Sequence, residues 1–344
     1  MQIGKVPGSL LNELVLKKMK RNNERALLSG GVGEDVGVLD FGGDYCAISC
    51  DPITGASKLI GKTSVYVACN DIAACGVSPV AILATILLPP GTSEAELGAL
   101  ADDMSEAAEA LGVSVIGGHT EVTDAVTRTV ISVTAVGAAP RGALVTSGGA
   151  KAGDALIMTK SAGLEGAAII AAEREQALSD RFGPAFVKCA KGLSDHISVV
   201  REGVAAGGFG VSAMHDVTEG GVLGAAWEMA EASGKGVVVY ADKINVLETV
   251  RQICDFYGAD VHRMVSSGSM LIATDRADEL TLVLDRAGVP ATEIGYFTSG
   301  GEGRVGDGGR SRDKGRFYER GGVRTALAQP GPDELYRVLR SGAE

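Results

Sequence analysis

The spacing of apolar residues along the chain predicts short helices and strands in alternation. Val65, Cys69 and Ile72 recur at helical spacing, which predicts a helix over residues 62–74. A second helix is expected over residues 93–111, because its opening sequence SEAE places a glutamate three positions after a serine, the pattern of a capping box. A glycine just past each of these segments favours a helix end there.

Most of the remaining chain carries a strand or helix pattern of its own. The expected strands cover residues 45–49, 80–88, 113–116, 129–137, 155–159, 210–214, 236–241 and 269–274. Further helices are expected over residues 9–19, 165–173, 193–206, 221–232 and 246–257. Strands and helices that alternate in both halves of the chain predict α/β or α+β layers of sheet and helix. Of these two classes, we expect an α+β fold.

A shift in composition indicates where the chain divides. At 344 residues it is long for one compact domain, so two domains are the default expectation. Gly, Ala and Ser dominate residues 140–153, which is typical of a linker. We therefore expect an N-terminal αβ domain over residues 1–147, a C-terminal αβ domain over residues 148–330 and a tail over residues 331–344.

The net charge of −11 changes the picture by excluding some partners, because a field of that sign repels nucleic acid and anionic membranes. The N-terminus lacks the apolar segment of a secretory signal, and the most apolar run, residues 80–88, is too short to span a bilayer. The six cysteines form no C-x-x-C pair, which favours reduced thiols in the cytoplasm over a zinc or disulfide site.

Acidic residues beside glycines or at strand ends are the main candidates for chemistry. They occur in GEDVGV (33–38), CDPIT (50–54), NDIA (70–73), GGHTE (117–121) and HDVTEGG (215–221). Each motif alone is also typical of a turn or a helix cap. Together they predict a site for Mg-ATP, because Mg²⁺ prefers carboxylate and phosphate oxygens and glycines let phosphates approach backbone N–H groups. The chain has no Walker P-loop and no dinucleotide-binding glycine fingerprint.

Two histidines and a pair of glycines within these motifs leave alternatives open. His119 and His215 are each either a general acid or base near neutral pH or a hydrogen-bonded turn residue. Gly220 and Gly221 precede a predicted helix, where they form either an anion-binding helix N-terminus or a point of close packing.

A segment rich in glycine and arginine, residues 299–323, follows the last predicted strand. It is either a mobile hairpin loop or a loop that contacts a phosphate or a partner. The arginines available for such a contact are Arg304, Arg310, Arg312 and Arg316.

The acidic motifs, in this order, resemble those of the aminoimidazole ribonucleotide (AIR) synthetase superfamily. The matching sequences are CDP (50–52), NDIAACGVSP (70–79), GGHTEV (117–122) and HDVTEGGVLGAAWEMA (215–230). Within that superfamily, KAGDALIMTKSAGLEGAAIIA (151–171) and SSGSMLIAT (266–274) are most similar to the hydrogenase maturation factor HypE and its relatives.

The resemblance implies a two-domain architecture in which N-terminal strands pair across a homodimer and ATP is bound mainly by the N-terminal half. It implies that Mg²⁺ is held by Asp35, Asp51, Asp71 and Asp216. The nucleotide-binding positions that it implies are Asp51, Asn70, Asp71, Gly117, Gly118, Gly220 and Gly221.

Two departures qualify the resemblance. The chain ends in PGPDELYRVLRSGAE, without the terminal cysteine on which HypE carries the carbamoyl group that it dehydrates to a thiocyanate. In addition, His119 stands where HypE and thiamin-monophosphate kinase have an aspartate, and Glu121 is the candidate replacement for that carboxylate.

The sequence therefore predicts an ATP- and Mg-dependent enzyme that phosphorylates an amide, formyl or carboxyl-like oxygen of an unidentified small molecule or protein tail. The candidate catalytic residues are His119, His215 and Glu121. Two alternatives stay open: a small-molecule kinase of the thiamin-monophosphate type, and a non-catalytic nucleotide-binding dimer.

Overall fold

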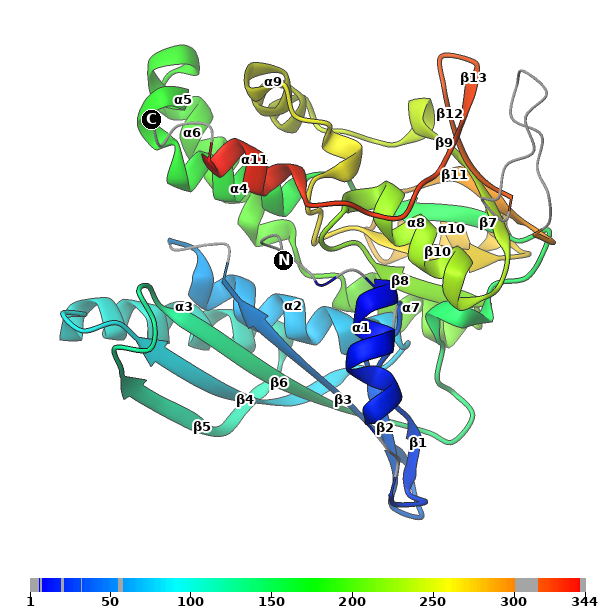
Figure 1. The fold of residues 1–344 in the computed structure, drawn as a ribbon, viewed down its shortest axis with the longest axis horizontal. Helices are drawn as coiled ribbons and strands as arrows, with labels where there is room; N and C mark the ends of the chain where they lie inside the picture. The colour runs from blue at the N-terminus through cyan, green and yellow to red at the C-terminus, as the bar shows by residue number, and fades with distance from the viewer. Residues whose placement is uncertain are drawn as a thin grey trace.

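The computed structural model describes residues 6, 8–19, 22–31, 33–54, 58–300 and 315–340, which form two sheets with their helices (Figure 1). The first sheet has six strands in the order β1-β2-β3-β6-β4-β5. Their bounds are β1 (Ala26–Leu28), β2 (Gly37–Asp40), β3 (Tyr45–Ile53), β4 (Pro79–Leu88), β5 (Ser114–Val122) and β6 (Val130–Ala139). Neighbouring strands are antiparallel except β4 and β5, which are parallel.

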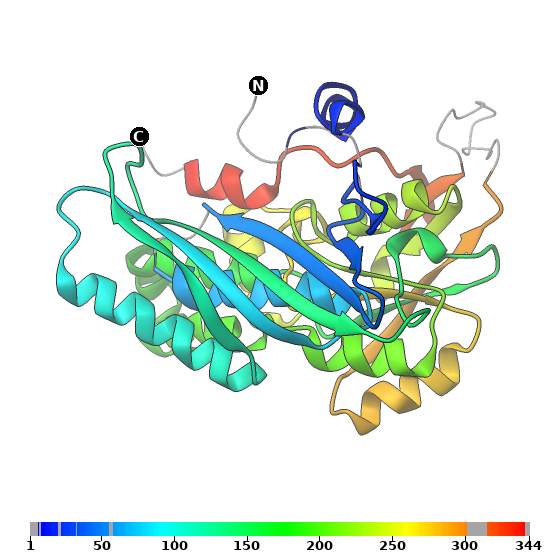
Figure 2. The ribbon, with the colours of Figure 1, turned by 90° about the horizontal axis from the view of Figure 1, so that it is seen from below.

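Helix α2 (Ile60–Ala74) lies behind this sheet in Figure 2, and α3 (Glu94–Leu111) packs beside α2 and next to β5. The other face of the sheet is turned toward the viewer. Along β6, buried residues alternate with partly exposed ones, as expected for a strand with one covered face. The capping box that opens α3 is confirmed: the Ser93 hydroxyl accepts the Glu96 N–H, and the Glu96 carboxylate accepts the Ser93 N–H.

The second sheet has seven strands in the order β13-β12-β9-β11-β7-β10-β8. Their bounds are β7 (Ala155–Thr159), β8 (Ala213–Asp216), β9 (Gly236–Tyr240), β10 (Met270–Thr274), β11 (Ala291–Thr298), β12 (Arg316–Arg320) and β13 (Val323–Ala326). The other α-helices are α1 (Gly8–Leu14), α4 (Leu164–Glu173), α5 (Glu175–Phe182), α6 (Pro184–Lys191), α7 (Val200–Phe209), α8 (Gly221–Ala232), α9 (Glu248–Tyr257), α10 (Ala277–Arg286) and α11 (Glu334–Arg340). Short 3₁₀ segments cover Leu16–Lys18, Ser147–Gly149, Gly192–His196, Ala241–Lys243 and Val261–Arg263. The expected α+β class is confirmed.

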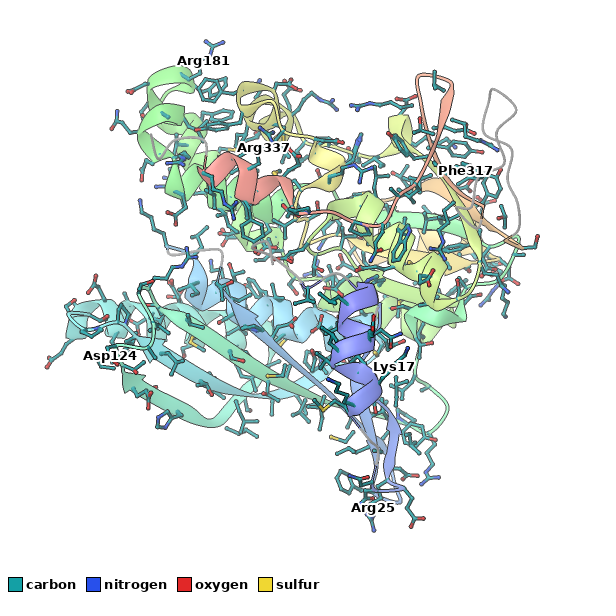
Figure 3. The ribbon with its side chains drawn as sticks, viewed as in Figure 1. Lys17, Arg25, Asp124, Arg181, Phe317 and Arg337 are labelled. Atoms are coloured by element: carbon teal, nitrogen blue, oxygen red, sulfur yellow. The ribbon has the colours of Figure 1, made fainter. Side chains whose placement is uncertain are left out.

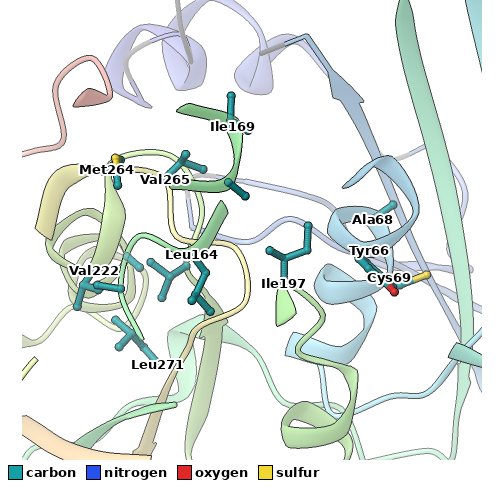
Figure 4. Close-up of a cluster of buried hydrophobic side chains, with 14 of the residues drawn as sticks. Tyr66, Ala68, Cys69, Leu164, Ile169, Ile197, Val222, Met264, Val265 and Leu271 are labelled. Carbon is teal, nitrogen blue, oxygen red and sulfur yellow. The ribbon is translucent and has the colours of Figure 1, made fainter. Parts of the chain in front are cut away.

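Helix α2 lies between the two domains and is buried along nearly its whole length. One side of it packs on β3 and β6, and another side packs on α7 and β8. In Figure 4, Ile197 lies between the α2 residues Tyr66 and Cys69 and the C-terminal core around Leu164. Asn70 and Asp71 are polar residues inside this buried helix. Burying such side chains is costly unless they have hydrogen-bond or charge partners, so both are expected to have partners there.

Several predicted boundaries were wrong, and the contacts give the reasons. The helix expected over residues 193–206 is interrupted between His196 and Val200, where Asn70 bonds to the backbone. The strand expected over residues 210–214 begins later, at Ala213, because Gly210 is the left-handed cap of α7. The strand expected over residues 113–116 continues to Val122, so the GGHTE motif lies within β5 rather than after it.

Within the expected tail, residues 334–340 form the helix α11, which packs on the C-terminal domain. Arg337, labelled in Figure 3, donates from a guanidinium nitrogen to the Gly258 carbonyl oxygen at 2.6 Å, just beyond α9. Arg174, at the end of α4, donates to the Leu339 carbonyl oxygen. Residues 327–340 therefore lie against the C-terminal domain.

The segment of glycine and arginine lies partly outside the described residues, among them Arg304, Arg310 and Arg312. Arg316 was wrongly grouped with anion-binding arginines: it is 3% exposed in β12, its guanidinium lies 4.9 Å from the Trp227 ring centroid, and it pairs with Glu231 at 2.5 Å. The six cysteines are free thiols. Among the described helices, none has the length and apolar character needed to cross a membrane.

Candidate functional site

An acidic cluster forms where the two domains meet. Asp35 lies before β2, Asp51 lies in β3, and Asp71 lies in α2, so the N-terminal domain supplies three carboxylates. The C-terminal domain supplies His215 and Asp216 at the end of β8, which packs against α2. The imidazole Nδ1 of His215 lies 3.9 Å from an oxygen of Asp35 and 3.8 Å from an oxygen of Asp216.

The glycine-rich loop packs closely against the C-terminal domain because Gly33, at the point of contact, has no side chain. That residue has a φ of 77°, and a Cβ there would lie 3.1 Å from the backbone oxygen of Glu228 in α8. Glycine adopts this conformation without strain and leaves space for the helix. The loop can therefore place Asp35 beside His215.

Asp71 and Asp216 are the buried carboxylates of the cluster, at 2% and 1% exposed, and Asp71 accepts a hydrogen bond from the Ser49 hydroxyl of β3. Burial raises the pKa of Asp71 well above its usual range, and the charges of nearby Asp216, Asp51 and Asp35 raise it further. The Ser49 hydrogen bond acts in the opposite direction. Carboxylates this close favour a cation between them.

The donor set fits Mg²⁺, which takes oxygen ligands and commonly combines one or two carboxylates with substrate phosphates. Asp35, Asp71 and Asp216 would hold such an ion, with Asp51 close enough to act on the pKa of Asp71. A divalent cation would relieve the repulsion that raises this pKa. Mg²⁺ at this position would supply charge neutralisation for a bound polyphosphate.

His215 is the basic residue of the cluster and is 2% exposed. Its Nε2 lies 3.1 Å from a carboxylate oxygen of Glu228. Burial acts to lower the pKa of His215, but the hydrogen bond to Glu228 and the charges of Glu228, Asp35 and Asp216 outweigh burial and raise this pKa to about 9. The two sequence-based alternatives for His215 are an acid–base group and a hydrogen-bonded turn residue. In the structure its imidazole ring lies within the acidic cluster, between Glu228 and the carboxylates of Asp35 and Asp216.

Glu34, Ser49 and Glu228 are residues of the site that sequence reasoning missed. Burial raises the pKa of the Glu34 carboxyl to about 7, although the charge of His215 lowers it. The signal for Glu34 was its place next to Asp35 in the glycine-rich loop. Ser49 stands in an ordinary strand pattern. Glu228 lies within the 215–230 motif but in an ordinary helix pattern, so neither residue was singled out.

His119 and Glu121 lie on a different face of the N-terminal sheet from the acidic cluster. His119 is paired in register with the exposed Thr85, which is paired with Ser132. Asp51 is paired with the next residue, the buried Val133, and successive side chains point to opposite faces. His119 and Glu121 contact each other at 3.0 Å and are exposed, so the structure does not bring them to His215.

Asn70 is fully buried, and its side-chain amide is used by the C-terminal domain. Its Nδ2 donates to the Ile197 carbonyl oxygen at 2.8 Å, and its Oδ1 accepts the Val199 N–H at 2.7 Å. The geometry thus gives Asn70 a structural role between domains. Its predicted contact with a nucleotide stays a prediction that this arrangement does not favour.

The glycine pairs also have packing roles. A Cβ at Gly118 would lie 1.9 Å from the Ala84 backbone oxygen, and a Cβ at Gly221 would lie 2.6 Å from the His262 backbone oxygen. The Gly220 N–H donates to the Asp333 carboxylate at 2.7 Å. Of the two alternatives for Gly220 and Gly221, the geometry favours close packing. Gly117 lies beside Gly118 in β5 and has ordinary contacts.

Comparison with known proteins gives the same relatives for sequence and for fold. The chain is 29% identical to a hydrogenase expression/formation protein of Methanocaldococcus jannaschii over 304 residues, covering 85% of this chain and 88% of that one. It is 29% identical to the carbamoyl dehydratase HypE of Escherichia coli over 249 residues, covering 70% of this chain and 71% of that one.

The solved structures that share the fold include two that contain HypE. The HypE–HypF complex contains a chain that matches with a TM-score of 0.71 at 22% identity, covering 94% of this chain and 100% of that one. A HypE structure in complex with ATP matches with a TM-score of 0.67 at 22% identity, covering 96% of each chain.

The family models cover most of both domains. Residues 33–139 match the N-terminal domain of the AIR synthase related proteins, and residues 151–308 match their C-terminal domain. The two matches occur in the family's own order and contain every residue of the acidic cluster. The chain therefore belongs to the AIR synthase related proteins and is similar within them to HypE.

Proposed function

We propose that this protein binds Mg-ATP at the acidic cluster and uses it to dehydrate a carbamoyl group. The observation that carries the proposal is the convergence of carboxylates from both domains: Asp35 and Asp216 lie 3.9 Å and 3.8 Å from His215 Nδ1, and their charges act on the pKa of Asp71. Relatives that match most of the chain bear the name carbamoyl dehydratase, and one structure with this fold is a complex with ATP.

The proposed reaction transfers the γ-phosphoryl group of ATP to the carbamoyl oxygen while the nitrogen loses one proton. The products of this step are ADP and an O-phosphorylated imidate. Cleavage of the carbon–oxygen bond then releases inorganic phosphate as the second N–H proton leaves, and a nitrile remains. The balance is one carbamoyl group and one ATP giving one nitrile, ADP and phosphate. Catalysis of such a transfer rests on positioning and charge stabilisation.

The residues of this chain divide that work between the domains. Asp35 and Asp71 hold the metal–nucleotide complex from the N-terminal side, and Asp216 holds it from the C-terminal side. Because the site lies where the two domains meet, a change in their packing changes the distance between these carboxylates. We further propose that the first domain ends at residue 147 and the second begins at residue 148, between the end of β6 at Ala139 and the start of β7 at Ala155.

The partners follow from the same proposal. One fold relative was solved as the HypE–HypF complex, and we propose that this chain also meets a protein that delivers its carbamoyl substrate. We place this work in the cytoplasm, since the cysteines are free thiols. The homodimer that the resemblance implies would form through the N-terminal sheet.

The test measures nucleotide binding and turnover together. Full-length protein is incubated with Mg-ATP and a peptide bearing an S-carbamoylated cysteine, and thiocyanate and phosphate are quantified. We expect equal amounts of both products. Asp71→Asn and Asp216→Asn should each lower turnover by roughly 100-fold or more, whereas Asp124→Asn, an exposed aspartate beyond β5, should leave it unchanged.

Three outcomes would contradict the proposal. A stable phosphorylated product without thiocyanate indicates a kinase of the thiamin-monophosphate type. Nucleotide binding without turnover for any carbamoyl compound indicates a non-catalytic dimer. Unchanged ATP affinity in both aspartate variants places the nucleotide elsewhere in the molecule.

A further inference from the structure

The imidazole of His215 is oriented as a metal ligand would be. Its Nδ1 lies 3.9 Å from Asp35 Oδ2 and 3.8 Å from Asp216 Oδ1, distances too long for hydrogen bonds. The three ligand atoms lie within 4.8 Å of one another. Two atoms bound to one ion at about 2.1 Å are separated by roughly 3–4 Å, depending on their angle. The two separations from His215 Nδ1, 3.9 Å and 3.8 Å, lie within that range.

The far side of the ring is held by a carboxylate. Glu228 Oε2 lies 3.1 Å from His215 Nε2, a position that favours an Nε2–H on that side. With an ion bound in place of the Nδ1 proton, the Nδ1 lone pair would face Asp35 and Asp216. Histidines that bind metals usually donate their second ring N–H in this way, and the partner fixes the tautomer and the ring orientation. Glu228 belongs to α8, outside the cluster of aspartates.

The backbone around Glu228 makes this arrangement rigid. Gly33 lies against the Glu228 backbone, so the loop that carries Asp35 is packed on the same turn of α8 that holds the histidine. His215 itself is paired in register with Leu271 in the buried part of the second sheet. Asp35, His215 and Glu228 are thus fixed relative to one another by direct packing of a loop, a strand and a helix.

We propose that His215 binds the metal ion of the acidic cluster through Nδ1, with Glu228 as its positioning residue. The site would then take Mn²⁺, or a similar first-row transition ion, more tightly than Mg²⁺, because imidazole nitrogen suits such ions and Mg²⁺ prefers oxygen. The inference rests on the proposed function, which puts a divalent ion at these carboxylates. The competing arrangement is a protonated His215 that only neutralises the aspartates.

Electron paramagnetic resonance on the metal-stripped, full-length protein separates the two arrangements. Mn²⁺ is titrated in the presence of ATP, and electron spin-echo modulation is recorded for imidazole nitrogen. We expect one tightly bound Mn²⁺ with nitrogen coupling and at least tenfold weaker binding of Mg²⁺ in competition. In protein labelled with ¹⁵N-histidine, the nitrogen modulation should change from the ¹⁴N to the ¹⁵N pattern. This change identifies the coupled atom as a histidine nitrogen without any substitution.

Variants assign the coupling to one residue. His215→Asn should abolish the nitrogen modulation and weaken Mn²⁺ binding at least tenfold, with a smaller effect on Mg²⁺. Glu228→Gln should retain the coupling but weaken Mn²⁺ binding about tenfold, as loss of a carboxylate behind a ligating histidine does. His196→Asn, at an exposed histidine of the Gly192–His196 segment, is the matched control and should change neither quantity.

The outcomes distinguish this inference from the proposed function. Mn²⁺ that binds without nitrogen coupling, or coupling that persists in His215→Asn, overturns the metal role of His215 and leaves the carboxylate site intact. Failure of the wild-type protein to bind either Mn²⁺ or Mg²⁺ with ATP overturns the proposed site itself. Where His215→Asn does not fold, the labelling experiment still tests whether a histidine nitrogen binds the ion, and absence of that coupling overturns the inference.

Discussion

At the scale of single residues, Asn70 shows how a motif residue can hold the site without touching its ligand. It stands next to Asp71 in α2, and both of its amide atoms bond to the backbone around the interruption between residues 196 and 200. These bonds hold a segment of the C-terminal domain against the helix that carries Asp71. The side chain therefore fixes where Asp71 lies relative to the other domain.

Replacing Asn70 with alanine should mainly reduce stability. The Ile197 carbonyl and the Val199 N–H would lose their partners in a buried position, and each such loss costs roughly 1–3 kcal/mol. We expect the free energy of unfolding of Asn70→Ala, measured in urea, to fall by about 2–5 kcal/mol. The control is Asn245→Ala, whose amide makes one bond at an exposed position and should cost under about 1 kcal/mol.

Unchanged stability together with weaker ATP binding would support the nucleotide-binding role that the resemblance implies for Asn70. If Asn70→Ala unfolds like the wild-type protein but binds ATP much more weakly, then Asn70 contacts the nucleotide. ATP affinity is measured under conditions where both variants are folded.

The residues of the site were predictable to different degrees for a physical reason. Asp35, Asp71 and Asp216 were predicted because carboxylates beside glycines or inside an apolar helix contradict the local pattern. Ser49 and Glu228 agree with their local patterns and act through contacts with residues far away in the chain. Such contacts leave no local mark, so one sequence does not reveal them.

At the scale of elements, α7 packs closely on α2 because glycines lie at the contact, and this packing joins the two domains. A Cβ at Gly203 would lie 2.3 Å from the Ala73 backbone oxygen, and a Cβ at Gly207 would lie 2.5 Å from the Gly76 Cα. These two glycines are one helical turn apart on α7 and face the end of α2. Close approach of the two helices is possible because both positions lack a side chain.

Adding one methyl group at this contact should separate the helices. Gly203→Ala forces the new Cβ against backbone, which cannot move like a side chain, and overpacking of this kind costs typically about 1–3 kcal/mol. Gly208→Ala on the same helix meets nothing within 4 Å and should be neutral or stabilising by up to about 1 kcal/mol. Thermal and urea unfolding of the pair measure the difference, and equal stabilities of the two variants would contradict the close contact.

Element boundaries were predictable where local chemistry sets them and not where distant contacts do. The start of α3 follows from its capping box, and Gly112 ends it in a left-handed conformation. The helix expected over residues 193–206 has no local break signal, since the interruption is held by Asn70 from another domain. The helices α5, α6 and α10 were missed although their apolar residues recur at helical spacing, and each spans only eight to ten residues.

At the scale of the whole molecule, the site depends on two domains of one chain, while one edge of the N-terminal sheet lacks a neighbour among the described residues. Strand β5 is the last strand of that sheet, and all nine of its residues are exposed. Val115, Ile116 and Val122 are 52%, 63% and 61% exposed, and Leu83 of the adjacent β4 is 39% exposed. An apolar, unprotected edge strand promotes association with another chain.

A second copy of this protein is the partner that the edge of β5 favours, because two identical strands related by a twofold axis complement each other. Ile116→Lys would place two like charges at that interface and should weaken the dimer at least roughly 100-fold, equivalent to about 3 kcal/mol. Light scattering during size-exclusion chromatography should show a wild-type dimer and a variant monomer. Leu282→Lys, at a 59% exposed leucine of α10, is the matched control and should remain dimeric. A dimer that survives Ile116→Lys, or a monomeric wild-type protein, would remove β5 from the assembly and leave its apolar edge to a different protein.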